Sequence, residues 1–326
     1  MNNMKIFSVI ISICLCLVKS KRISESCVQE NEEFIRCQCA GNEEFNLPTN
    51  INYENLTDLT ITSCRSANFH FSSLPNAKII RHILIQNISG SLMLEPFVIS
   101  KKLDTFKLRN INKIPIISHD TFTSISSIKT FVIEDTRIEQ FDEQFTNINI
   151  DNFILRNVSI KQMIGINFSG QGKTLKIIDT IIRNVAGNLN FAFFETIEII
   201  NSTFEFEKPG DIPIQGINAK IINCVFSNAS VNLVVNDNIT IKGNCADGKS
   251  SLRISSKSVQ SVGNRLPTEI IYTQNRDNPI LFHNINNTVC IAGNCKCPKS
   301  SGYNSCYKYH PNFYLGIVLL GILYKF

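Results

Sequence analysis

The sequence lacks most of the signals that identify an enzyme or a nucleic-acid-binding protein. It has no tryptophan, no run of basic residues and no phosphate-loop, dinucleotide-binding or nucleophile motif. Its five histidines are scattered, and its formal charge of +5 falls to +3 once Lys5 and Lys19 are lost with the N-terminal segment described next. These absences argue against nucleic acid or an anionic membrane surface as a partner, and we expect no cofactor and no metal.

A long apolar run is also missing, and the most apolar segments lie at the two ends. Near the N-terminus, Ile6–Val18 follows Lys5 and precedes Ser20, which predicts a secretory signal peptide over residues 1–20. An uncleaved anchor is the alternative, although the run is shorter than the ~20 residues that span a bilayer. The chain is therefore expected to enter the secretory pathway.

The C-terminal tail, residues 307–326, predicts a second targeting signal. Phe313–Tyr324 is apolar but too short to cross a hydrocarbon core of ~30 Å. After the polar stretch Tyr303–Asn312, such a tail is typical of a GPI-attachment signal with Ser300–Gly302 as the acceptor region. Cleavage there would remove Cys306 and leave an odd number of cysteines. A short membrane anchor, or a tail packed on the last rung, are the alternatives; membrane attachment would place the protein on the outer face of the plasma membrane.

Eight Asn-x-Ser/Thr sequons agree with secretion, and behind a signal peptide several should carry glycans. They start at Asn55, Asn87, Asn157, Asn167, Asn201, Asn228, Asn238 and Asn286.

Two columns of residues recur with a period of about 22 to 25, which indicates one small unit stacked many times. Apolar residues alternate before each member of the first column, as in a short strand with one buried face. The first column is Asn87, Asn110, Asp135, Asn157, Asp179, Asn201, Asn223 and Asn244. The second column, expected to stack as a spine opposite the strands, is Phe71, Phe97, Phe122, Phe145, Phe168 and Phe191.

The segment Ile128–Phe141, with Phe131, Ile133 and Ile138 at its apolar positions, resembles an extracellular leucine-rich repeat. The resemblance covers Leu56 to Met163, with Ile and Phe in place of most Leu. The family's inward Asn is here Cys, Ile, Thr, Val or Ser. From Leu175 on, the units look more like rungs of a right-handed parallel β-helix. The resemblance implies a mainly β fold: a single right-handed solenoid of ~22-residue rungs with a parallel sheet over residues 65–275.

The asparagine column is expected to face solvent rather than the core. Asn87, Asn157 and Asn201 are sequons as well as members of the column, and a glycan cannot enter the interior of a solenoid. The column therefore predicts an outer corner of each rung, partly covered by sugar.

The cysteines predict caps at both ends, residues 21–64 and 276–306, because a solenoid otherwise exposes its core there. Ten of the 12 cysteines remain after loss of Cys14 and Cys16, and an even number in an oxidising compartment suggests disulfides. Zinc binding is the rival interpretation for Cys37-x-Cys39, but no histidine lies at the spacing of a zinc ligand. Cys224 and Cys245 fall in one column, which predicts a rung-to-rung disulfide. The candidates for pairing within the caps are Cys27, Cys37, Cys39, Cys64, Cys290, Cys295, Cys297 and Cys306.

The outward columns favour binding over catalysis. Carboxylates occur singly in them, whereas a glycan-cleaving site needs them paired. An apolar stripe with charged neighbours is more typical of a partner surface. These positions are Lys176, Ile178, Glu198, Ile200, Lys220 and Ile222. We expect a non-enzymatic recognition or adhesion ectodomain that binds an extracellular protein. The alternatives are a carbohydrate-binding or carbohydrate-active β-helix and a structural surface protein without a specific ligand.

Overall fold

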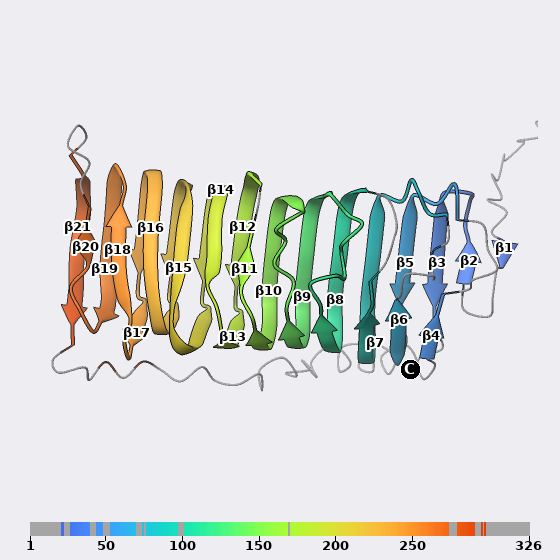
Figure 1. The fold of residues 1–326 in the computed structure, drawn as a ribbon, viewed down its shortest axis with the longest axis horizontal. Helices are drawn as coiled ribbons and strands as arrows, with labels where there is room; N and C mark the ends of the chain where they lie inside the picture. The colour runs from blue at the N-terminus through green and yellow to red at the C-terminus, as the bar shows by residue number, and fades with distance from the viewer. Residues whose placement is uncertain are drawn as a thin grey trace, which may run out of the picture.

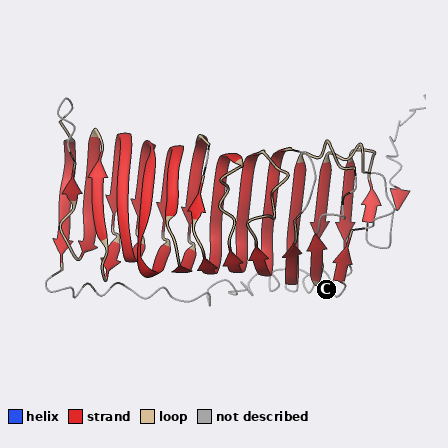
Figure 2. Ribbon diagram, viewed as in Figure 1, coloured by secondary structure: helices blue, strands red, loops and turns tan. Residues whose placement is uncertain are grey.

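The chain forms an elongated solenoid of about 11 turns in a computed structural model (Figure 1). The structure describes residues 21–22, 27–39, 44–47, 53–69, 74, 76–96, 101–168, 170–273, 279–290, 295 and 297. Within these ranges every regular element is a strand, and the strands run nearly perpendicular to the long axis (Figure 2). The expected mainly β solenoid with a parallel sheet is confirmed. The predicted signal peptide and the C-terminal tail lie outside the described residues.

The strands of the N-terminal half lengthen along the chain. Short strands come first: β1 (Lys21–Arg22), β2 (Cys27–Gln29), β3 (Phe34–Gln38), β4 (Glu44–Asn46), β5 (Asp58–Thr62) and β6 (Ser66–Phe69). Longer strands follow, each bent at its asparagine corner: β7 (His82–Leu94), β8 (Lys102–Ile117), β9 (Ser127–Phe141) and β10 (Asn149–Met163).

The strands of the C-terminal half vary more in length, from two to 20 residues. They are β11 (Ile166–Asn167), β12 (Gly172–Ile178), β13 (Ile181–Val185), β14 (Leu189–Ile200), β15 (Thr203–Ile222), β16 (Val225–Lys242), β17 (Cys245–Asp247), β18 (Ser251–Ser255), β19 (Ser258–Leu266), β20 (Ile271–Tyr272) and β21 (Leu281–Val289).

Parallel pairing from turn to turn builds flat faces along the solenoid. The first face holds the strand segments that precede each corner and runs unbroken from β3 to β21. The second face holds the segments that follow the corner. A third face, formed by β11, β14, β15, β16, β18 and β20, begins at Ile166. Before it, residues 118–126 and 142–148 join one rung to the next without a strand.

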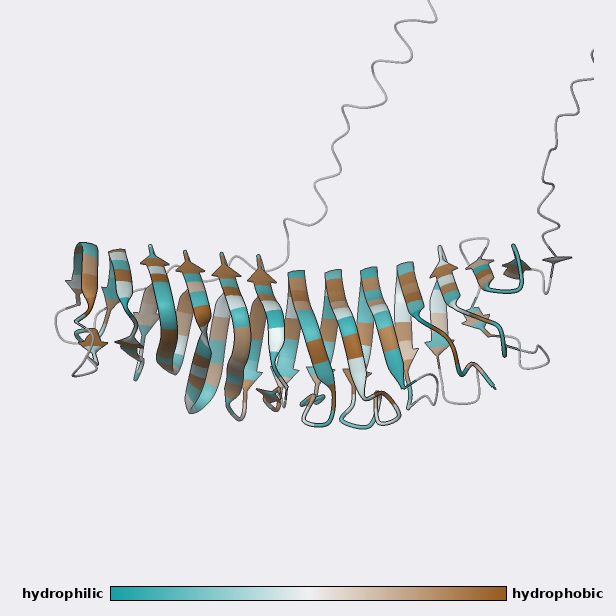
Figure 3. Cartoon of the chain, turned by 90° about the horizontal axis from the view of Figure 1, so that it is seen from above, coloured by the Kyte–Doolittle hydropathy of each residue, from teal (hydrophilic) through white to brown (hydrophobic). Residues whose placement is uncertain are grey.

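Two stacks of phenylalanine fill the core of the middle rungs. Phe122, Phe145 and Phe168 stack with ring centroids 6.1 and 5.6 Å apart, which confirms this part of the predicted spine. A second stack on the first face, Phe106, Phe131 and Phe153, meets the spine edge to face across the core; the Phe122 and Phe131 centroids are 5.6 Å apart. Alternating apolar and polar bands mark the strands in Figure 3, as one-sided burial requires.

The spine departs from the predicted column at its C-terminal end. Phe168 packs against Phe194, with centroids 4.9 Å apart, whereas Phe191 instead contacts Phe204 at 6.4 Å. The prediction for Phe191 is wrong because the third face begins here and the register of β14 shifts between Phe191 and Phe194. Phe71 and Phe97 lie outside the described residues.

The asparagine column sits where the backbone turns through the left-handed conformation. Its members from Asn87 to Asn223 all have φ between 50° and 57°, a region that Asn and Asp tolerate far better than β-branched residues. Their side chains are exposed or half-buried, as predicted. Neighbouring side chains also bond from rung to rung: the Asn110 amide donates to the Asn87 oxygen at 2.9 Å, and the Asn157 amide to Asp135 at 2.8 Å.

Asn244 was expected to be the last member of this column, and that prediction is wrong. Gly243 occupies the left-handed corner with φ 66°, and the side chain of Asn244 is buried. The cause is a shorter rung: only 20 residues separate Asn223 from Gly243. Asn244 and Asn264 therefore hold the inward position that follows the corner, with Gly263 at the next corner. In the earlier rungs this inward position holds Ile, Thr, Val, Ser or Cys.

The predicted disulfide between Cys224 and Cys245 is wrong for the same reason. The shortened rung pairs Cys245 with Val225, so Cys245 is displaced by one residue from the column of Cys224. Cys245 instead joins Cys297, and Cys224 is a free, buried thiol. Burial raises its pKa to about 12.

The remaining disulfides lie near the two ends. At the N-terminal end Cys27 pairs with Cys37 and Cys39 with Cys64, all four within the segment expected to form the cap. At the C-terminal end Cys290 pairs with Cys295, while Cys297 reaches back to Cys245 rather than to another cysteine of the 276–306 segment. Cys306 lies outside the described residues.

Candidate functional site

All eight predicted glycan acceptors lie on the surface of the solenoid. Asn157 and Asn228 are half-buried and the other six are exposed, so an attached sugar would meet no core residue. Three of them, Asn87, Asn157 and Asn201, stand on the asparagine corner. Sugars there would cover the boundary between the first and second faces and leave the middle of the first face open.

The predicted partner surface is a continuous patch on the first face of β12, β14 and β15. Ile178, Ile200 and Ile222 stand side by side in register and are half-buried. Beside them, the carboxylate of Glu198 forms ion pairs with the ammonium groups of Lys176, at 2.9 Å, and Lys220, at 3.8 Å. The structure thus brings the six residues together, and it shows that the three charges form one ion-paired group rather than separate contacts.

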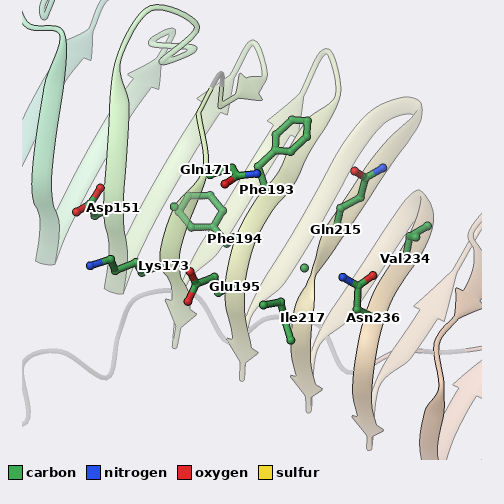
Figure 4. Close-up of a pocket in the computed structure, with 12 residues that line it drawn as sticks. Asp151, Gln171, Lys173, Phe193, Phe194, Glu195, Gln215, Ile217, Val234 and Asn236 are labelled. Carbon is green, nitrogen blue, oxygen red and sulfur yellow. The ribbon is translucent and has the colours of Figure 1, made fainter.

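A surface groove opens at the other edge of this patch, between the first and third faces (Figure 4). It encloses about 480 Å³. The polar groups that line it are three amides and three charged groups, and exposed apolar side chains stand among them. The lining residues are Asp151, Gln171, Gly172, Lys173, Phe193, Phe194, Glu195, Gln215, Gly216, Ile217, Val234 and Asn236.

Phe193 is the most unusual residue of the groove. The residue is 47% exposed, and its backbone has φ 72°, a conformation that is strained for a bulky side chain. The extra residue in β14 between Phe191 and Phe194 forces this conformation, since β15 has only Gln215 at the same place. The neighbouring Phe194 is buried, and a Cβ at Gly172 would collide with its ring. The fold therefore holds this aromatic ring outward even though the backbone of Phe193 is strained there.

The charges of the groove alternate along the solenoid axis. Asp151, Lys173 and Glu195 occupy one column on successive rungs, next to the paired column Asn152, Thr174 and Thr196. With strands ~4.8 Å apart, the two carboxylates stand roughly 10 Å apart and have an ammonium between them. Retaining glycosidases hold their two carboxyl groups roughly 5 Å apart and inverting ones roughly 6.5–9.5 Å apart, whereas in this column an ammonium group stands between the two carboxylates.

One buried carboxyl lies outside the groove. Glu143 accepts a hydrogen bond of 2.8 Å from the backbone N–H of Phe145, and its other oxygen is buried without a hydrogen-bond partner. Burial raises the pKa of Glu143 to about 7, while hydrogen bonds from the backbone of Phe145 and of Gln144 act in the opposite direction. Phe145 itself has φ 52°, so the carboxyl fixes a turn. Over the described ranges, no three His, Cys, Asp or Glu side chains gather closely enough to hold a metal ion.

No pattern in the sequence directly indicated the groove. Its amides and Phe193 come from the corner between two faces, where no column is regular. The one available signal was the loss of the phenylalanine spacing after Phe191, followed at once by Phe193 and Phe194.

Comparison with protein-family models, with curated proteins and with solved structures finds no match to this chain. Within the described part of the chain, no helix has the length and apolar character needed to cross a bilayer. The four disulfides among the described residues are typical of a protein that folds in an oxidising compartment.

Proposed function

We propose that this chain is a non-enzymatic extracellular glycoprotein that recognises a protein partner through the first face of β12, β14 and β15. The observation that carries the proposal is the half-buried stripe of Ile178, Ile200 and Ile222 beside the ion-paired group around Glu198. Apolar surface with a polar rim favours association. The alternating charges of the groove support a binding role over a catalytic one.

Placement of this surface beside the sequons supports the same proposal. Asn201 stands at the corner next to Ile200, and Asn238 stands one rung beyond Asn218 on the groove side. Glycans at these two positions would border the patch without standing on its centre. A partner would then approach the patch from directly above the first face.

We also propose that the N-terminal rungs are leucine-rich-repeat-like. Up to Met163 each turn has two strand segments and a connecting loop, and the third face begins only at Ile166. This cross-section supports the resemblance of the segment from Leu56 to Met163, and it gives the recognition role an argument by analogy of fold.

Attachment to the outer face of the plasma membrane belongs to the same proposal. Cleavage before Cys306 would leave nine cysteines, and the disulfides account for eight of them with Cys224 as the ninth. An odd number is therefore no obstacle to a GPI-attachment site at Ser300–Gly302. Phosphatidylinositol-specific phospholipase C should release the protein from intact cells; protein that stays on the cells after treatment would contradict this form of attachment.

The partner surface is tested by charge reversal on cells that display the full chain. Lys176→Glu and Lys220→Glu with Ile200→Asp should abolish photo-crosslinking from a probe at Ile222 to a partner on neighbouring cells. The matched control makes the same kinds of change on the second face, where Glu139 lies between Lys113 and Lys161. It combines Lys113→Glu and Lys161→Glu with Ile181→Asp and should retain crosslinking. Unchanged crosslinking in the first variant, with its circular dichroism intact, would refute the proposal.

The groove favours a second candidate function, the binding of a neutral oligosaccharide. An outward aromatic ring can stack on the C–H face of a sugar, and the amides of Gln171, Gln215 and Asn236 can bond to its hydroxyl groups. A glycan array probed with the wild-type protein and with Gln215→Ala tests this function. Array signals that are absent in the wild type, or unchanged in the variant, would exclude it.

A further inference from the structure

The last rung of the solenoid exposes side chains at positions that are buried everywhere else. Phe282, Ile285 and Val289 pair in register with Val259, Ser261 and Leu266, which are buried in the core. Their own exposed fractions are 51%, 42% and 46%. These residues thus occupy inward positions of a rung on which no described rung is stacked, so among the described residues the apolar core is open at this end.

The opposite end of the solenoid is closed. There β2 pairs antiparallel with β3, and β1 pairs antiparallel with β2, at the right of Figure 1. Cys27, Ile35 and Cys37 of these strands are all buried. The antiparallel strands and the Cys27–Cys37 disulfide end the parallel stack, so this end offers no continuation for another solenoid.

The exposed edge of β21 carries no charge, and a bulge at Asn284, where φ is 53°, lets both Phe282 and Ile285 face inward. Residues 279–290 contain no Lys, Arg, Asp or Glu, and the single proline, Pro279, precedes the strand. Among the described strands β21 pairs with β19 alone. Its outer row of backbone N–H and C=O groups, and the apolar side chains along it, are therefore available to another strand.

We propose that β21 pairs antiparallel with β21 of a second copy of this chain, so that two solenoids join end to end. A twofold axis normal to the first face keeps the inward positions of both strands on the same side, so Phe282 and Ile285 of each copy extend the core of the other. An uncharged strand meets its own copy without like-charge repulsion. Because the N-terminal end is closed, the contact forms a closed dimer and not a filament.

The sequon in β21 is compatible with this arrangement. Asn286 is exposed and precedes Asn287, whose side-chain oxygen accepts a hydrogen bond of 2.8 Å from the buried Asn264 amide. Asn287 therefore points inward and Asn286 points away from the core. A glycan on Asn286 would project from the outer corner of the joined rungs.

The test is the association state of the full glycosylated chain in mild detergent, measured by sedimentation over a range of concentrations. The wild type should be a dimer, and a photo-crosslinker at His283 should join two copies. Phe282→Lys and Ile285→Lys should weaken the dimer by roughly 100-fold or more, because each would bury an unpaired ammonium group. Both side chains are exposed in the single copy, so circular dichroism and the melting temperature of the variants should remain close to those of the wild type.

Matched controls come from exposed apolar residues far from the open end. Ile79→Lys and Ile164→Lys, whose parent residues are 45% and 47% exposed, should leave the dimer unchanged. A wild type that stays monomeric, dimers that survive Ile285→Lys, or open polymers would overturn the proposal. So would dimers that appear only after removal of residues 307–326, since the chain's own tail would then cover the end. Dimers that form only after Asn286→Gln has removed the glycan would overturn the proposal for the glycosylated protein.

Discussion

The side-chain amide of Asn244 donates a hydrogen bond of 2.8 Å to the side-chain oxygen of Asn264, one rung further along the solenoid, and both residues are buried. Asn264 in turn donates to the backbone carbonyl of Ile241 at 3.1 Å and to Asn287 at 2.8 Å. The inward asparagines thus satisfy backbone groups that the turn leaves unpaired, and they connect the last three rungs through the core.

Asn264→Ala should destabilise the protein strongly. It would leave buried polar groups of Asn244 and Ile241 without partners, at a cost of about 2–4 kcal/mol. Asn223→Ala is the matched control, because its exposed amide makes a single rung-to-rung bond of 3.3 Å and should cost about 1 kcal/mol. Denaturant unfolding of both variants provides the measurement, and equal losses of stability would contradict the buried network.

Glu143 should make stability fall as the pH rises. Its pKa is about 7 in the folded state against an ordinary 4.5, so the native state binds the proton more tightly than the unfolded chain does. The contribution of Glu143 to the free energy of unfolding is fully present below about pH 4.5. It is lost as the pH rises to about 7, by an amount on the order of 3 kcal/mol. Glu143→Gln keeps an acceptor for the Phe145 N–H and should remove this slope from melting curves recorded across that range. A slope that persists in the variant would assign the pH dependence to other groups.

Cys224 should be the one cysteine among residues 27–297 that alkylates without reduction. Its thiol is buried and its pKa is raised to about 12, so iodoacetamide should modify it only after unfolding. Peptide mapping of the unreduced protein should find Cys245 linked to Cys297. A Cys224–Cys245 peptide, or a labelled Cys245, would contradict the register of the shortened rung.

Phe193→Gly should raise stability while it removes the aromatic ring from the groove. Glycine adopts φ 72° without strain, and relief of that strain in a bulky residue is worth about 1 kcal/mol. If the groove binds sugar, the same variant should lose its glycan-array signal although it melts at a higher temperature. Phe194→Gly is the contrast, since it removes a buried ring and should destabilise. A lower melting temperature for Phe193→Gly would show that the outward ring is structural.

The candidate sites followed from the sequence only where the solenoid is regular. Ile178, Ile200 and Ile222 could be placed side by side because three consecutive rungs have 22 residues each. Cys245 and Asn244 could not be placed, because a shorter rung moves a residue to the opposite side of the strand and no local feature records the change. The groove was beyond prediction since its residues come from five rungs and from the irregular corner between two faces.

The sequence by itself determined the solenoid and the outward side of the asparagine corner. Period and alternation fix which residues can be buried together, and the left-handed turn selects Asn or Asp at the corner whatever surrounds it. Only the tertiary structure decided the disulfide partners of Cys245 and Cys224, the strained outward position of Phe193 and the open core at Phe282. These depend on the number of residues in individual rungs and on what stacks above and below them, and such contacts between distant segments leave no periodic trace in the chain.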